Sequence, residues 1–70
     1  MIPRVPVSST SIASIGYDEA TQTLEVEFAH GGVYQYFDVP ARVHQDLMAA
    51  SSIGRYVAEE IKPNYRYSRA

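Results

Sequence analysis

The segment "TLEVEF" constrains the fold most, because apolar and polar residues alternate in it without exception. Leu24, Val26 and Phe28 would lie on one side of an extended chain, and Glu25 and Glu27 on the other. A period of two is typical of a strand with one face in a core and one in water. The chain is therefore expected to contain a sheet that is covered on one side.

Two more strands are predicted around this one. "SIASIGYD", residues 11–18, reads as the first strand and is joined to "TLEVEF" by the turn "DEATQ". Gly16 marks a bulge or a close approach of another backbone. After the glycine-rich turn "AHGG", whose residues accept the positive φ of tight hairpins, "VYQYF" returns as the third strand. The three strands are expected to form an antiparallel meander.

The length of the glycine turn decides which face Tyr34 and Tyr36 occupy, since a shift of one residue moves every side chain to the other face. A two-residue turn at His30 and Gly31 would place Glu27 opposite Tyr34. Both tyrosines would then be exposed beside carboxylates, which repel phosphate. This register gives no platform for stacking nucleic-acid bases.

A three-residue turn over residues 30–32, with the last glycine left-handed, would place Phe28 opposite Tyr34 and Val26 opposite Tyr36. We favour this register because it uses the second glycine and because aromatic pairs add about 0.5–1.5 kcal/mol. The tyrosines would then belong to the core. The wet face would be formed by Glu25, Glu27 and Gln35.

Two helices are predicted after the sheet. "VPARVHQDLMAA" has Pro40 at the first helical position, where no amide hydrogen is needed. "SSIGRYVAEEIK" is capped by Ser51 or Ser52 and ends before Pro63. The short connection predicts a helical pair on one face of the sheet. The expected class is α+β in the order βββαα, as a single domain over residues 1–70 with an extended arm at 1–10 and a C-terminal tail at 63–70.

Length and composition fit this small domain. A chain of 70 residues makes one domain, and it has no cysteine, so neither disulfides nor thiolate chemistry is expected. Its apolar runs are far too short to span a membrane. We therefore expect a cytoplasmic protein that does not enter the membrane.

The polar residues suggest no catalytic or metal site. His30 and His44 have no further ligands at metal spacing. His44 and Asp46 are two residues apart on a helix and point to different sides, which rules out a triad with the nearby serines. We expect a non-enzymatic protein that needs no cofactor and no metal.

The charge is uneven along the chain. The net charge is −2, but residues 41–70 hold five basic against three acidic residues. In the tail "KPNYRYSRA", cations alternate with tyrosines, which suits a single-stranded nucleic acid. The alternative is that the tail packs as a terminal strand or coil and leaves its charges in water. The candidate nucleic-acid-binding residues are Arg42, Arg55, Lys62, Tyr65, Arg66, Tyr67 and Arg69.

The order of these motifs resembles the KTSC domain, a family named for its occurrence at the C-terminus of some lysyl-tRNA synthetases. The resemblance covers roughly residues 7–69. It rests on a Y-x-Y motif, a following Val-Pro and an A-x-S-x-G pattern, which correspond to Tyr34, Tyr36, Val39, Pro40, Ala50, Ser52 and Gly54. One departure is "YVAEEI", where the family has a more basic helix end. We expect the motif residues Tyr34, Tyr36, Pro40, Ser52 and Gly54 to be structural.

The resemblance implies a small bacterial or phage domain whose family has no assigned function. RNA binding is implied by the synthetase fusion, and no catalytic residue or cofactor comes with the family. Weak binding of RNA, with tRNA as the candidate, by the basic C-terminal half is thus our first hypothesis. The second is a protein-interaction module or homodimer that uses Val33, Phe37 or the edge of the first strand.

Overall fold

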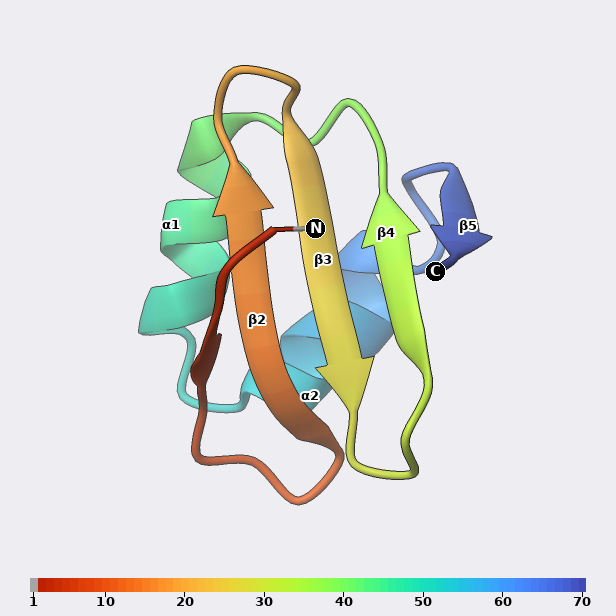
Figure 1. Cartoon of the computed structure of the whole chain (residues 1–70). Helices are drawn as coiled ribbons and strands as arrows, with labels where there is room; N and C mark the ends of the chain where they lie inside the picture. The colour runs from red at the N-terminus through yellow and green to blue at the C-terminus, as the bar shows by residue number, and fades with distance from the viewer. Residues whose placement is uncertain (1) are drawn as a thin grey trace.

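The computed structural model describes residues 2–70 as a twisted antiparallel sheet with helices on one face (Figure 1). The five strands follow each other in sequence order across the sheet, from β1 at one edge to β5 at the other. The strands are β1 (Arg4–Pro6), β2 (Ile12–Asp18), β3 (Thr23–Phe28), β4 (Val33–Tyr36) and β5 (Tyr67–Arg69). The helices are α1 (Ala41–Ala49), α2 (Ile53–Tyr56) and η1 (Val57–Ile61), a π-helical turn that continues α2.

The predicted α+β class with a C-terminal helical pair is confirmed, but the prediction of three strands is wrong. The expected arm, whose first residue lies outside the described residues, forms β1 along β2. The expected tail returns after η1 and forms β5 along β4. Strands of only three residues carry no readable alternation, and they form because a neighbouring strand offers an unpaired edge.

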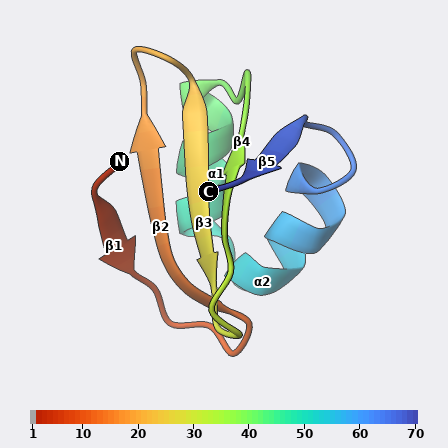
Figure 2. The same ribbon diagram turned by 45° about the vertical axis from the view of Figure 1, so that its right-hand side comes forward.

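The added strand β1 also changes the edges of the sheet. The strand at residues 11–18 was predicted to have a free edge for a partner. In the structure this strand is β2, and it is paired with β1 on one side and with β3 on the other. Its edge is therefore not available to a second protein. The edges are β1 and β5 instead (Figure 2).

The β3–β4 hairpin has a register that neither prediction contained. Val26 lies opposite Tyr34, and Leu24 lies opposite Tyr36. This pairing is displaced by two residues from the favoured one, so the tyrosines still share a face with the apolar residues of β3. The predicted face is right, and the predicted partners are wrong.

The turn explains the displacement. Phe28 and Gly32 close the hairpin with a hydrogen bond of 2.8 Å from the Phe28 amide to the Gly32 carbonyl, so the loop is residues 29–31. Gly31 has φ +108° and supplies the left-handed third position of a three-residue loop. The predicted turn had this length but assigned the left-handed position to Gly32.

Two residues singled out in the sequence stand at the starts of the helices. Ser52 caps α2 by accepting a hydrogen bond of 3.3 Å from the Arg55 amide, as one of the two predicted caps. Pro40 is the residue before the first helical position of α1 rather than that position itself.

The core lies between the sheet and the helices. The buried apolar residues are Ile12, Ile15, Leu24, Val26, Phe28, Tyr36, Val39, Leu47, Val57 and Ile61.

The opposite face of the sheet is partly covered by the chain leading into β1. A side chain at Gly16 would overlap the carbonyl oxygen of Pro3, so the glycine marks a close backbone approach, one of the two predicted roles. Ile2 and Arg4 also lie against this glycine. The segment before β2 is therefore held on the sheet by packing as well as by strand pairing.

Glu25 was predicted on the wet face, and the structure contradicts this: the residue is only 1% exposed. Its carboxylate accepts hydrogen bonds from the Arg4 guanidinium and, at 2.9 Å, from the Gln35 amide. Ser14 accepts from Arg4 and donates to Glu27, at 3.1 and 2.7 Å. The side chains on this face were read as solvated because β1, which covers them, was not predicted.

The balance of forces on Glu25 favours its charged form. Burial alone would raise its pKa, but the hydrogen bonds from Gln35 and Arg4 and the positive charge of Arg4 outweigh burial. The pKa of Glu25 is therefore lowered. A buried, hydrogen-bonded carboxylate of this kind belongs to the structural framework.

Candidate nucleic-acid interface

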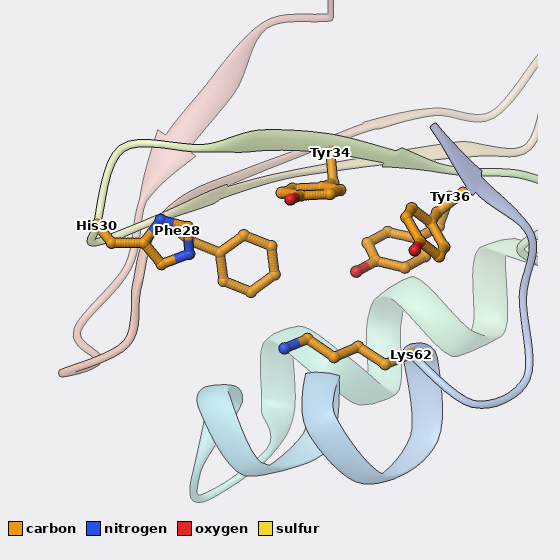
Figure 3. Close-up of a pocket in the computed structure, with 6 residues that line it drawn as sticks. Phe28, His30, Tyr34, Tyr36 and Lys62 are labelled. Atoms are coloured by element: carbon orange, nitrogen blue, oxygen red, sulfur yellow. The ribbon is translucent and has the colours of Figure 1, made fainter. Parts of the chain in front are cut away.

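An open cavity of ≈310 Å³ lies between strands β3 to β5 and the end of η1 (Figure 3). We call it the aromatic cleft. Four elements and the hairpin turn contribute to it: β3, β4, β5, the end of η1 and the turn. Its lining residues are Phe28, His30, Tyr34, Tyr36, Lys62 and Tyr67.

The β4–β5 ladder brings most of the cleft together. Tyr36 lies opposite Tyr67, and Tyr34 lies opposite Arg69, so all four side chains share one face of the sheet. The ring of Tyr67 lies 5.9 Å from that of Tyr36 and 5.8 Å from that of Tyr34, centre to centre. The Arg69 guanidinium lies 5.7 Å from the centre of the Tyr34 ring.

Phe28 connects the aromatic side of the cleft to its cations. Its ring meets Tyr34 edge to face at 5.5 Å and stacks with His30 at 5.5 Å. The Lys62 ammonium lies 4.9 Å from the centre of the Phe28 ring. Figure 3 shows the Lys62 side chain on the helix side, across from Tyr34 and Tyr36. A cation–π contact leaves the ammonium able to meet an anion as well.

Exposure differs among the rings. Tyr36 is buried, Tyr34 is half-buried, and Tyr67 is 61% exposed. Burial, together with the charges that Tyr34 and Tyr67 would carry if ionised, raises the pKa of Tyr36, so its hydroxyl stays protonated at neutral pH and can donate a hydrogen bond. The inner end of the cleft is therefore formed by the buried ring of Tyr36, and its accessible rim by the exposed ring of Tyr67.

The charges at the cleft are positive and not neutralised by protein groups. No carboxylate lines it. The three ion pairs found among residues 2–70 involve neither Lys62 nor Arg69. An anionic ligand would therefore meet two cations without displacing a protein carboxylate.

The tail residues do not all lie at the cleft. Arg66 directly precedes β5, and its identified contacts are with residues outside the cleft. Its guanidinium pairs with the Asp38 carboxylate at 2.8 Å and lies over the ring of Phe37. Tyr65 is half-buried and packs against the core. The structure thus brings together Lys62, Tyr67 and Arg69, and it separates them from Arg66 and Tyr65.

The remaining basic candidates do not line the cleft. Arg55 forms an exposed ion pair with Glu59 at 3.0 Å, one helical turn further along. Arg42 is exposed on α1, which lies behind β2, away from β5 (Figure 1). A single basic surface formed by all the predicted cations is therefore not present.

The family motif serves the fold, and part of it also serves the cleft. A side chain at Gly54 would meet the hydroxyl of Ser11, so this glycine lies in close contact with the segment before β2. Ser52 caps α2, and Pro40 precedes α1. Tyr34 and Tyr36, which the sequence suggested were core residues only, pack on the core and also line the cleft.

The polar groups outside the cleft give no second candidate site among residues 2–70. No group of three or more His, Cys, Asp or Glu side chains that could hold a metal ion occurs among residues 2–70. His44 stacks on Tyr17 with ring centres 4.7 Å apart, and burial lowers the pKa of His44.

Among residues 2–70, no helix is long and apolar enough to cross a membrane.

Sequence reasoning missed Phe28, His30, Tyr34 and Tyr36 as cleft residues. It placed the tyrosines on the apolar face correctly, but it equated that face with a closed core. The helices leave the part of that face beside β5 open, and the cleft lies there. The usable signal was the aromatic content of both "VYQYF" and "YRYSR", which becomes meaningful only when the two segments are paired.

The fold and the cleft define a small α+β domain whose sheet is covered by helices on one face and carries an aromatic, cationic opening at one edge. The model of the KTSC domain matches residues 8–65, which is most of the chain. The chain belongs to the KTSC domain family.

Similar proteins match nearly the whole length of this chain. An uncharacterized protein of Stutzerimonas stutzeri is 48% identical over 67 residues, which cover 94% of each chain. The crystal structure of a KTSC domain protein from Yersinia pestis has a TM-score of 0.95 at 43% identity and covers 100% of this chain and 99% of its own.

A third relative is much longer than this chain. The lysine–tRNA ligase of Nostoc punctiforme is 36% identical over 67 residues, which make up 96% of this chain and 12% of the ligase. A domain of this kind thus occurs both as a small protein and as a minor part of a larger one.

Proposed function

We propose that this domain binds a single-stranded segment of RNA, weakly and without catalysis, through the aromatic cleft and the cations beside it. The observation that carries the proposal is the grouping of Tyr34 and Tyr67 with Lys62 and Arg69 around one open cleft that no carboxylate lines. Single-stranded RNA is bound by aromatic rings that stack on bases and by cations that meet the backbone.

The negative net charge does not oppose this placement. Three of the carboxylates are paired with arginines elsewhere: Glu25 with Arg4, Asp38 with Arg66, and Glu59 with Arg55. None of the other five carboxylates lines the cleft, so Lys62 and Arg69 are the charged groups beside its rings. Two or three phosphate contacts are far fewer than the ~6–10 of strong binders, so the affinity is expected to be low and sensitive to salt.

The relatives suggest which RNA to test. Relatives in three organisms are lysine–tRNA ligases, and each matches about the whole of this chain. We extend this to the present chain as a proposal: its RNA is tRNA or a similar structured RNA with single-stranded loops. A bacterial cytoplasmic location is part of the same proposal, since the sequence has no cysteine and the relatives include tRNA ligases.

The test is a titration with bulk tRNA and with a short single-stranded RNA at about 50 and about 200 mM salt. We expect binding at the lower salt and a large loss at the higher one. The double substitution Lys62→Ala with Arg69→Ala should reduce the dependence of log K on log salt by about 1.4, since each single-strand contact contributes about 0.7.

The matched control is Arg42→Ala with Arg66→Ala, which removes the same charge outside the cleft. The control should bind nearly as well as the unmodified protein. Absence of binding at low salt would overturn the proposal. Equal losses in the two double variants would show that diffuse charge, and not the cleft, attracts the RNA.

A second candidate function is protein interaction, including a homodimer. One observation favours it: Val5 is 53% exposed on the edge strand β1. Val33 and Phe37, the surface residues named from the sequence, are half-buried in the structure. Pro3 and Pro6 limit strand addition at β1, because proline cannot donate to a ladder. A monomeric mass by light scattering at high protein concentration would exclude the homodimer.

A further inference from the structure

The cleft has room for one small ligand. Its volume of ≈310 Å³ is at the lower end of the ~300–1,000 Å³ of typical small-molecule sites. We infer that the aromatic cleft takes a single unstacked base of the bound RNA, rather than supporting a run of stacked bases. This inference rests on the proposed function and specifies how the RNA is held.

The angles between the rings favour one inserted base. Tyr67 is tilted by 54° from Tyr34 and by 42° from Tyr36, and Phe28 is at 82° to Tyr34. Successive stacked bases need successive, roughly parallel ring faces on an open surface. Rings that face one another at steep angles form a box, in which one planar group can meet one face and several edges.

The polar groups of the box suit a base and its backbone. The Tyr36 hydroxyl is protonated at neutral pH and can donate to a base edge. The Lys62 ammonium lies over the ring of Phe28, and the Arg69 guanidinium lies over the ring of Tyr34. The two cations are therefore at different places around the cleft. The phosphates that flank an inserted base therefore have two cations to meet.

Accessibility also points to insertion. Tyr67, which is 61% exposed, lies on the terminal strand and forms the outer wall. The other two tyrosines of the cleft are buried or half-buried, so Tyr67 is its most exposed tyrosine. Tyr67 is the residue whose removal should affect base binding with the least effect on the fold.

The test compares a short oligouridine with an oligomer of the same length in which every residue is abasic. The two have the same phosphates, so they differ only in the bases. At low salt we expect the abasic oligomer to bind about 5- to 150-fold more weakly, which corresponds to one stacked base. Because the chain has no tryptophan, tyrosine fluorescence reports binding directly and should be quenched by the oligouridine alone.

Two variants at one position separate the ring from its hydroxyl. Tyr67→Ala should weaken oligouridine binding by a similar factor and abolish the preference over the abasic oligomer. Tyr67→Phe keeps the ring and should keep most of the preference. Circular dichroism of both variants checks that the fold is retained.

The outcomes distinguish this inference from the proposed function. Equal binding of the oligouridine and the abasic oligomer would overturn base insertion and leave RNA binding by the cations intact. A preference for bases that survives Tyr67→Ala would place the base outside the cleft and would also overturn it. No binding of either oligomer, nor of tRNA, at low salt would overturn both.

Discussion

The two terminal strands are alike in length and differ in what surrounds their cations. β1 and β5 each have three residues and form opposite edges of the sheet (Figure 2). Arg4 on β1 meets the buried carboxylate of Glu25 and the hydroxyl of Ser14. Arg69 on β5 lies over the ring of Tyr34 and forms no ion pair among those found in residues 2–70.

Charge alone therefore does not identify a binding residue. The cation of β1 is satisfied by acceptors inside the protein, so its interaction contributes to folding. The cations near β5 have no carboxylate among the residues that line the cleft. The same residue type is structural at one edge and available to a ligand at the other. Four predictions test this comparison.

The largest effect is expected from Arg4→Met. It leaves the Glu25 carboxylate buried with Gln35 as its remaining side-chain donor. Breaking a buried pair costs about 3–5 kcal/mol, and the partial exposure of Arg4 favours the lower end, about 3 kcal/mol. Urea unfolding measures the loss. Arg4→Met combined with Glu25→Gln should recover part of it, and the absence of any recovery would contradict the pairing.

Gly16→Ala should cost about 1–3 kcal/mol, because the new methyl group overlaps the backbone oxygen of Pro3 and displaces the segment before β1. The same substitution in a chain that lacks residues 1–3 should have a much smaller effect. Thermal unfolding of the full chain and of the shortened chain, each with and without Gly16→Ala, measures the difference. Equal losses in the long and short chains would mean that Gly16 is required for another reason.

A smaller effect is expected from acid. The pKa of Glu25 is lowered in the folded protein below its ordinary value of 4.5, so the unfolded chain takes up this proton more readily. The stabilisation by Glu25 is fully present above the ordinary value, and it is lost as the pH falls through the lowered pKa. Urea unfolding between about pH 6 and about pH 3 should therefore decline less steeply for Glu25→Gln than for the unmodified protein. Parallel declines would disprove the role of Glu25.

The smallest effect on stability is expected from Arg69→Met, the counterpart of Arg4→Met on β5. Its guanidinium is exposed and has no ion pair among those found in residues 2–70, so the free energy of unfolding should change by less than about 0.5 kcal/mol. RNA binding should weaken, whereas Arg4→Met should leave the affinity of the folded protein unchanged. A loss of stability near that of Arg4→Met would remove the distinction between the two edges.

Much of the fold could be predicted from local patterns. The alternation of "TLEVEF" gave the buried face of β3, and the glycines gave the hairpin. Ser52 was found as a cap, and Gly16 as a close approach. Each of these depends on interactions within a few residues or on the absence of a side chain. That is why one sequence suffices to read them.

The site could be predicted only in part. Lys62, Tyr67 and Arg69 were named from composition, but so were Arg42, Arg55, Tyr65 and Arg66, which lie elsewhere. The members of the cleft are selected by the pairing of β4 with β5. No local pattern encodes that pairing, because both strands are short and the helices separate them in the chain.

Local periodicity and backbone preference are enough to predict the α+β class, the apolar face of the central strands and the positions of the helices. Local patterns do not show that the chain ends add strands, that Glu25 is buried beside Arg4, or that Arg66 pairs with Asp38 while Arg69 lies over Tyr34. These features depend on the pairing of β1 with β2 and of β4 with β5. Pairing between segments far apart in the chain is set by the free energy of the whole fold.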